Sequence, residues 1–233
     1  MGIREKVLKT CLPYLPDKPN CIEIGSAIGK NEGCSTHTIG SHALKHGGKM
    51  ASVEFEEEII RKSRVLISSK IAELKEFVTY YQGHSLEQLP LALSDLGTVD
   101  FAFIDGGGHP EVNLQEFELI SACLSERGII VIDDAEPVKL TKNYPLPRPF
   151  GKATLIYPAL MLAKQCSAGK PYKSRNNGGE ANPKTLEILH ELGDFMETRD
   201  YVLHGQQHKM IVVAETNTLI QIQKDLGIIR KQR

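Results

Sequence analysis

Short runs of hydrophobic residues, rich in β-branched side chains, alternate along this chain with longer segments of mixed polarity. The runs predict strands at residues 21–25, 49–54, 77–81, 99–105 and 128–133. The segments between them predict helices at residues 35–46, 56–69, 85–96 and 110–126. In the last helix, Leu114, Phe117, Ile120 and Leu124 recur every three to four residues and form one buried stripe. Strands that alternate with helices in this way favour an α/β fold with a parallel sheet covered on both faces.

The alternation stops after Asp134. Seven of the twelve prolines lie from Pro137 to Pro183, and several proline-rich and glycine-rich stretches indicate loops. Helices are predicted at residues 154–165 and 183–192, and two strands at residues 200–204 and 210–215 are joined by a short, hairpin-like connection, so they pair antiparallel. We expect a single domain over residues 1–233, with a lid or substrate-binding insertion at about residues 136–182.

The composition is that of an ordinary globular protein, with 41% hydrophobic and 24% charged residues. The formal net charge is only −1, so nothing favours binding to nucleic acid or to an anionic membrane, and a small molecule is the expected partner. The 5 cysteines are scattered and lack CxxC spacing, which argues against a disulfide framework or a structural zinc site. Without a signal peptide or a long apolar run, a cytoplasmic location is expected, and a homodimer is left open.

Polar residues follow the predicted strands at the edge where open parallel sheets bind their ligands. Gly25 ends the first strand and lets the backbone approach a ligand closely, although a glycine also commonly ends a strand without one. Glu54 ends the second strand, where a carboxylate can accept hydrogen bonds from the hydroxyls of a ribose. Phe55 can stack on an adenine, or else pack in the core.

Three carboxylates, those of Asp105, Asp133 and Asp134, follow the fourth and fifth strands. They repel one another at one sheet edge unless a cation, a proton or a ligand compensates their charge. Mg²⁺ or another divalent cation, bound through oxygen ligands, would do so, whereas capping of a turn or helix is the alternative. His109 is a candidate general base because imidazole titrates near neutral pH, and orienting a loop is its alternative role.

Together these segments resemble the class I S-adenosylmethionine-dependent methyltransferases. Within that class they are similar to the O-methyltransferases of the catechol and caffeoyl-coenzyme A type and to methyltransferase family 24. The resemblance covers roughly residues 20–135 and rests on five short motifs in order, Glu23-Ile-Gly25 with Gly33-Cys-Ser35-Thr36, Val53-Glu54, Gly83-His84-Ser85, Phe103-Ile-Asp105-Gly-Gly-Gly-His109 and Gly128-Ile-Ile-Val-Ile-Asp133-Asp134. It implies a Rossmann-like three-layer αβα sandwich with a mostly parallel seven-stranded sheet and an antiparallel last strand.

The resemblance also implies roles for individual residues. The methionine part of S-adenosylmethionine would be lined by Glu23, Gly25, Ser26 and Gly33, with Ser35 and Thr36 at the following helix start. The nucleoside part would be held by Glu54 at the ribose and by Phe55, His84 and Ser85 at the adenine. The divalent metal would be held by Asp105, Asp133 and Asp134, and the catalytic residues would be His109 and Asp105, the latter also touching the cofactor.

Two departures from the family pattern leave choices open. Residues 29–32 look like an insertion, so either Gly29 or Gly33 faces the cofactor. An extra glycine precedes His109, and no lysine stands where the catechol-type enzymes place their base.

The expected reaction is O-methylation of a small-molecule hydroxyl, assisted by a divalent metal that lowers the pKa of the hydroxyl. One alternative is an NAD-dependent oxidoreductase, against which the chain lacks the G-x-G-x-x-G spacing after its first strand. The other is a non-catalytic cofactor-binding protein with the same fold.

Overall fold

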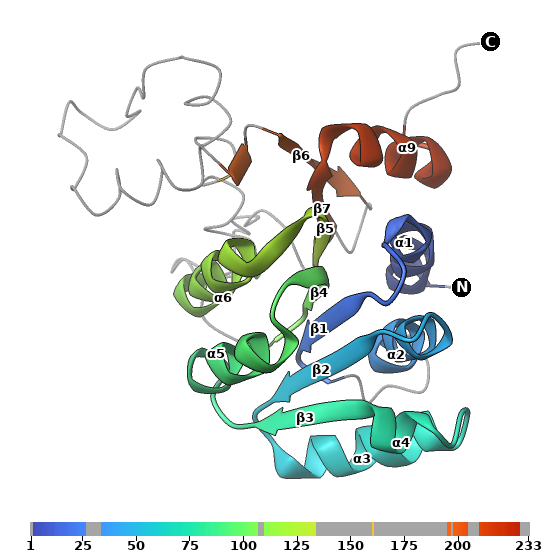
Figure 1. The fold of residues 1–233 in the computed structure, drawn as a ribbon, viewed down its shortest axis with the longest axis vertical. Helices are drawn as coiled ribbons and strands as arrows, with labels where there is room; N and C mark the ends of the chain where they lie inside the picture. Colours follow the sequence, from blue (N-terminus) through green and yellow to red (C-terminus); the bar gives the residue numbers. More distant parts are fainter. Residues whose placement is uncertain are drawn as a thin grey trace, which may run out of the picture.

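The computed structural model of the chain describes residues 2–26, 34–106, 110–133, 160, 195–196, 198–204 and 210–228. Its centre is a 7-stranded sheet with the strand order β3-β2-β1-β4-β5-β7-β6 (Figure 1). The strands are β1 (Asn20–Ile24), β2 (Lys49–Glu54), β3 (Val78–Gln82), β4 (Val99–Ile104), β5 (Leu124–Ile132), β6 (Arg199–His204) and β7 (Met210–Glu215). Strands β1 to β5 pair in parallel, and β7 pairs antiparallel with both β5 and β6. The predicted fold class is therefore confirmed.

Helices cover both faces of this sheet (Figure 1). The described helices are α1 (Ile3–Cys11), the 3-10 turn η1 (Leu12–Tyr14), α2 (Ser35–Lys45), α3 (Glu57–Ser68), α4 (Leu74–Phe77), α5 (Ser85–Leu96), α6 (Pro110–Cys123) and α9 (Thr216–Leu226). Side chains on one face of the strands, such as Ile22 and Ile24, pack under α5 and α6. Side chains on the other face, such as Cys21, Phe101 and Phe103, pack under α1, α2 and α9. Because successive residues of a strand point to opposite faces, a sheet buried on both sides has the nearly continuous hydrophobic runs seen in the sequence.

The boundary between α6 and β5 differs from the prediction. The helix ends at Cys123 and the strand begins at Leu124, whereas the sequence pattern placed the helix up to residue 126. Polar contacts hold this strand extension: Ser125 Oγ donates to Asp100 at 2.7 Å, and Arg199 donates to the carbonyl of Ser125 at 2.9 Å. Such contacts leave no trace in hydrophobic periodicity, so the pattern could not place the boundary.

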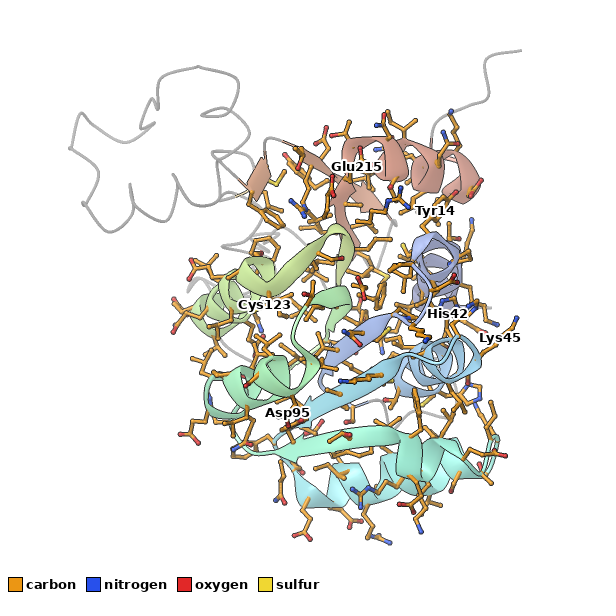
Figure 2. All side chains as sticks on the ribbon, in the orientation of Figure 1. Tyr14, His42, Lys45, Asp95, Cys123 and Glu215 are labelled. Carbon is orange, nitrogen blue, oxygen red and sulfur yellow. The ribbon has the colours of Figure 1, made fainter. Side chains whose placement is uncertain are left out.

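Helix α1, which the sequence pattern did not single out, packs with α2 and α9. Its side chains Val7 and Leu8 are fully buried. At the end of η1, the hydroxyl of Tyr14 donates to Asp225 of α9 at 2.5 Å, so Tyr14 lies against the end of that helix (Figure 2). The start of the chain is thereby attached to a segment that follows the sheet.

The predicted insertion at residues 136–182 lies outside the described residues, apart from Leu160, and the predicted helix at residues 183–192 lies outside them entirely. The single-domain assignment stays a prediction. Among the described residues, no helix is long and apolar enough to cross a membrane.

Candidate active site

The parallel strands are tied together just beyond their carboxyl ends. At four places the residue after a strand donates its backbone N–H to the carbonyl of the neighbouring strand. These bonds, of 2.9 to 3.0 Å, run from Gly25 to Val53, from Gly83 to Glu54, from Asp105 to Ile24 and from Asp133 to Ile104. The sheet therefore continues into its loops, and the polar residues of those loops are brought to one edge.

Gly25 occupies the closest of these approaches. Its φ is +85°, in the region that favours glycine, and a Cβ built on it would lie 2.6 Å from the carbonyl oxygen of Asp105 and 2.9 Å from the nitrogen of Gly106. These atoms belong to the backbone, which cannot rotate away from the Cβ as a flexible side chain can. A glycine here is thus required by contact between the loops after β1 and β4, independently of any ligand.

Glu23 is buried beneath this edge and is 0% exposed. Its carboxylate accepts hydrogen bonds from the hydroxyls of Ser35, of Thr36 at 2.6 Å and of Ser52 at 3.3 Å. Burial raises the pKa of Glu23 to about 7, against the lowering effect of these hydroxyl donors. Glu23, Ser35 and Thr36 therefore fix the start of α2 to the sheet, and their contact with a cofactor stays a prediction.

Glu54, at the end of β2, has a carboxylate held by backbone on both sides. Oε2 accepts the N–H of Ser26 at 2.8 Å, and Oε1 accepts the N–H of Glu56 at 3.0 Å. A carboxylate oxygen can accept more than one hydrogen bond, so both oxygens keep acceptor capacity toward two vicinal hydroxyls. Phe55 follows at once with 68% of its surface exposed, which is unusual for so large an apolar side chain.

His84 and Ser85 lie at the start of α5, next to the end of β2. The Nδ1 atom of His84 accepts the N–H of Leu86 at 3.3 Å and so caps the helix. A neutral ring in this arrangement carries its proton on Nε2 and can donate it outward. Glu54, Phe55 and His84 together offer hydrogen-bond acceptors, an aromatic face and a donor.

Asp105 and Asp133 are both contacted by one guanidinium, that of Arg4 in α1. Nη1 of Arg4 lies 3.0 Å from Oδ2 of Asp105, and Nη2 contacts Oδ2 of Asp133. The arginine also stacks over Phe103 of β4, 5.9 Å from the ring centroid. The two aspartates continue the alternation of β4 and β5 toward the face that α1 covers, which places Arg4 between them.

Part of the chain is similar in sequence to a known protein family. Residues 26–135 match the sequence profile of a methyltransferase domain, methyltransferase family 24. Residues 26–135 are therefore similar to a methyltransferase domain.

Solved methyltransferases share the fold of this domain at low sequence identity. The O-methyltransferase TomG from Streptomyces achromogenes, in complex with SAM, is 13% identical with a TM-score of 0.54, over 91% of this chain and 79% of that one. An O-methyltransferase from Bacillus cereus in complex with SAH is 15% identical, with a TM-score of 0.52 over 92% and 82%. A putative rRNA-methylase from Clostridium thermocellum is 8% identical, with a TM-score of 0.53 over 92% and 98%. No curated protein sequence matches the chain.

The methyltransferase domain brings together most of the site residues expected from the sequence. Those described at the carboxyl edge of the sheet are Glu23, Gly25, Ser26, Ser35, Thr36, Glu54, Phe55, His84, Ser85, Asp105 and Asp133. Gly33, His109 and Asp134 lie outside the described residues. Sequence reasoning missed Arg4, because an arginine in an amphipathic helix is indistinguishable from a solvated one until the helix is placed.

In the structure, the guanidinium of Arg4 places a positive charge next to both Asp105 and Asp133. Within the described part of the chain, no group of three or more His, Cys, Asp or Glu side chains is arranged to hold a metal ion. The expected divalent cation thus has a competitor for two of its predicted ligands.

The raised pKa of Glu23 predicts a pH dependence of stability in the methyltransferase domain. Between its ordinary value of 4.5 and about 7, the folded protein keeps a proton that the unfolded chain releases. The free energy of unfolding should therefore fall as pH rises through this window. Glu23→Gln removes the titrating carboxyl group. The difference in unfolding free energy between wild type and variant should therefore change by about 3 kcal/mol over this pH range.

Urea unfolding of both proteins at several pH values between 4.5 and 8 measures this difference. Glu73→Gln, at an exposed position, is the control and should follow the wild-type profile. Parallel profiles for wild type and Glu23→Gln would show that Glu23 titrates as an ordinary carboxyl group.

Proposed function

We propose that the protein is an S-adenosylmethionine-dependent O-methyltransferase that acts on the hydroxyl of a small molecule. The observation that carries the proposal is the carboxylate of Glu54, oriented by two backbone N–H groups in a methyltransferase domain. A pre-oriented carboxylate at this strand end suits the two hydroxyls of a ribose. The exposed ring of Phe55, directly after it, suits an adenine face.

The remaining contacts of the nucleoside would come from the start of α5. His84, whose Nδ1 accepts the N–H of Leu86, would donate from Nε2 to the base, and Ser85 would add a hydroxyl. The methionine part would lie over the loop after β1, near Gly25 and Ser26. The N–H of Ser26 is already bonded to Glu54, so the ribose end and the methionine end of the site are mechanically linked.

Methyl transfer depends mainly on how the acceptor hydroxyl and the methyl group are aligned with each other. When bound, S-adenosylmethionine supplies a methyl group on a sulfonium sulfur. An in-line displacement by the acceptor oxygen would form the C–O bond as the C–S bond breaks, release S-adenosylhomocysteine and pass the hydroxyl proton to a base. His109 is our candidate base, and the loop after β4, anchored through Asp105, would present it.

A divalent metal at Asp105 and Asp133 is a poor fit to the residues described. Both carboxylates contact Arg4, whose positive charge would repel a divalent cation bound to the same two side chains. We therefore assign no step of the reaction to a metal ion.

Other functions of the same fold have less support. The likeness to a putative rRNA-methylase concerns the fold alone, and a net charge of −1 provides no general attraction for RNA. The names of TomG and the Bacillus cereus enzyme as O-methyltransferases favour a hydroxyl acceptor. An NAD-dependent oxidoreductase lacks support from the family match, which is to a methyltransferase domain.

Calorimetric titration of the purified protein with S-adenosylhomocysteine, S-adenosylmethionine and NAD tests the cofactor. We expect saturable binding of the first two and none of NAD. A panel of catechols, sugars and other hydroxylated small molecules, assayed for S-adenosylhomocysteine release, then tests the reaction. Binding of NAD alone would overturn the proposal, whereas S-adenosylhomocysteine binding without turnover on any acceptor would favour the non-catalytic alternative.

A further inference from the structure

Arg4 stands at an unfavourable place for a cation unless anions hold it there. It is the second residue of α1, whose N-terminal end carries the positive end of the helix dipole. Its side chain is only 19% exposed, so water offers it little compensation. The carboxylates of Asp105 and Asp133 supply the negative charge that neither the helix end nor the solvent provides.

Arg4 contacts one oxygen of each of the two carboxylates that a metal would need. Nη1 and Nη2, the two ends of the guanidinium fork, reach Oδ2 of Asp105 and Oδ2 of Asp133 respectively. The side chain of Asp133 is 3% exposed and that of Asp105 is 12% exposed, so the carboxylates are approached from few directions. A small divalent cation binds carboxylate oxygens at roughly 2 Å, so a cation on these two side chains would lie close to the guanidinium and would be repelled by its positive charge. Arg4 and a divalent cation therefore exclude each other here.

Arg4 is also held by an aromatic ring and by the packing of its own helix. The guanidinium carbon lies 5.9 Å from the centroid of the buried Phe103 ring, in the range of a cation–π contact. On α1, the buried side chains Val7 and Leu8 hold the helix against the face of the sheet that carries Phe101 and Phe103. Removing Arg4 from the carboxylates would require α1 to shift or the side chain to leave its aromatic support.

We propose that Arg4 takes the place of a divalent cation in this methyltransferase domain, so that the site works without a metal. The guanidinium neutralises part of the charge of Asp105 and Asp133 and holds the loop after β4 next to the one after β5. Arg4 is thus a positioning residue, and α1 forms part of the acceptor side of the site. The statement about the acceptor rests on the proposed function, whereas the exclusion of a cation does not.

Titration with Mn²⁺, followed by the electron paramagnetic resonance signal of the free ion, tests the exclusion directly. We expect the wild type to show no saturable site that depends on Asp133. Arg4→Met removes the guanidinium from both carboxylates and should raise Mn²⁺ affinity by about 10-fold or more. Arg4→Met combined with Asp133→Asn should lose this gain.

Arg61→Met is the matched control. Arg61 also pairs with a carboxylate, that of Glu58 at 2.7 Å, but on the exposed surface of α3. Its removal should leave Mn²⁺ binding unchanged, which separates the effect of the site from that of net charge.

Wild-type Mn²⁺ binding that Asp133→Asn abolishes would overturn the proposal, and so would an unchanged affinity in folded Arg4→Met. If Arg4→Met does not fold, the comparison of wild type with Asp133→Asn decides. S-adenosylhomocysteine binding, measured on each protein by calorimetry, reports on the proposed function separately. Turnover, once an acceptor is found, should be the same in chelator and in added Mg²⁺, and a return of activity only with Mg²⁺ would also contradict the proposal.

Discussion

Glu54→Gln is expected to weaken the binding of S-adenosylhomocysteine by about 10-fold to 150-fold, the scale of hydrogen bonds to a charged group. The amide keeps the shape of the carboxylate and one accepting oxygen. It loses the charge and the second acceptor, so it cannot serve the N–H groups of Ser26 and Glu56 together and also receive two ribose hydroxyls. The loss should appear in the dissociation constant measured by calorimetry.

Glu57→Gln is the control for this substitution. Glu57 also lies just after β2, but its side chain is exposed. It should leave the dissociation constant unchanged. An unchanged constant for Glu54→Gln, with a wild-type circular dichroism spectrum, would reject the ribose assignment and with it the main support for the proposed function.

Gly25→Ala is expected to destabilise the fold by roughly 2 to 4 kcal/mol, because strain and a backbone clash act at one position. The positive φ of Gly25 disfavours any side chain, and the new Cβ would lie 2.6 Å from the carbonyl oxygen of Asp105. Relief requires the loops after β1 and β4 to separate. Urea or thermal unfolding should show the loss, and cofactor binding should weaken with it because the loop of Ser26 moves.

Gly227→Ala isolates the cost of the backbone conformation alone. Gly227 ends α9 with a φ of +76°, and a Cβ there meets nothing within 4 Å. This variant should lose only about 1 kcal/mol. Equal losses for the two variants would mean that the contact between the loops contributes nothing to the requirement for glycine.

The order of strands and helices could be predicted from the sequence because burial on both faces gives each strand a continuous hydrophobic run. Residues 49–54 and 85–96 were predicted with the bounds that β2 and α5 have in the structure. The start of β5 was not, because its first residues are held by Asp100 and Arg199 through polar contacts. A hydrophobic pattern indicates which side chains are buried, whereas these polar contacts bury little hydrophobic surface.

The site was predictable only where it follows the strands directly. Glu54 and Asp105 stand at strand ends, and parallel strands bring such ends to one edge. Arg4 lies far away in the chain and reaches the edge through the packing of α1. Its role depends on tertiary placement, which no local spacing encodes. Because Arg4 could not be placed from the sequence, a divalent cation was the natural prediction for the charge that compensates three aspartates.

The docking of α1 joins segments that are synthesised at very different times. Lys6 donates to the carbonyl of Leu226, 220 residues later, and Tyr14 donates to Asp225. At roughly 5 to 20 residues per second, α1 leaves the ribosome on the order of 10 s or more before its partner helix is available. The parallel strands β1 to β5 can pair in that interval, and α1 can already pack on α2 and on this part of the sheet. Strands β6 and β7 and helix α9 are made last, so the contacts that join α9 to α1 are among the last to form.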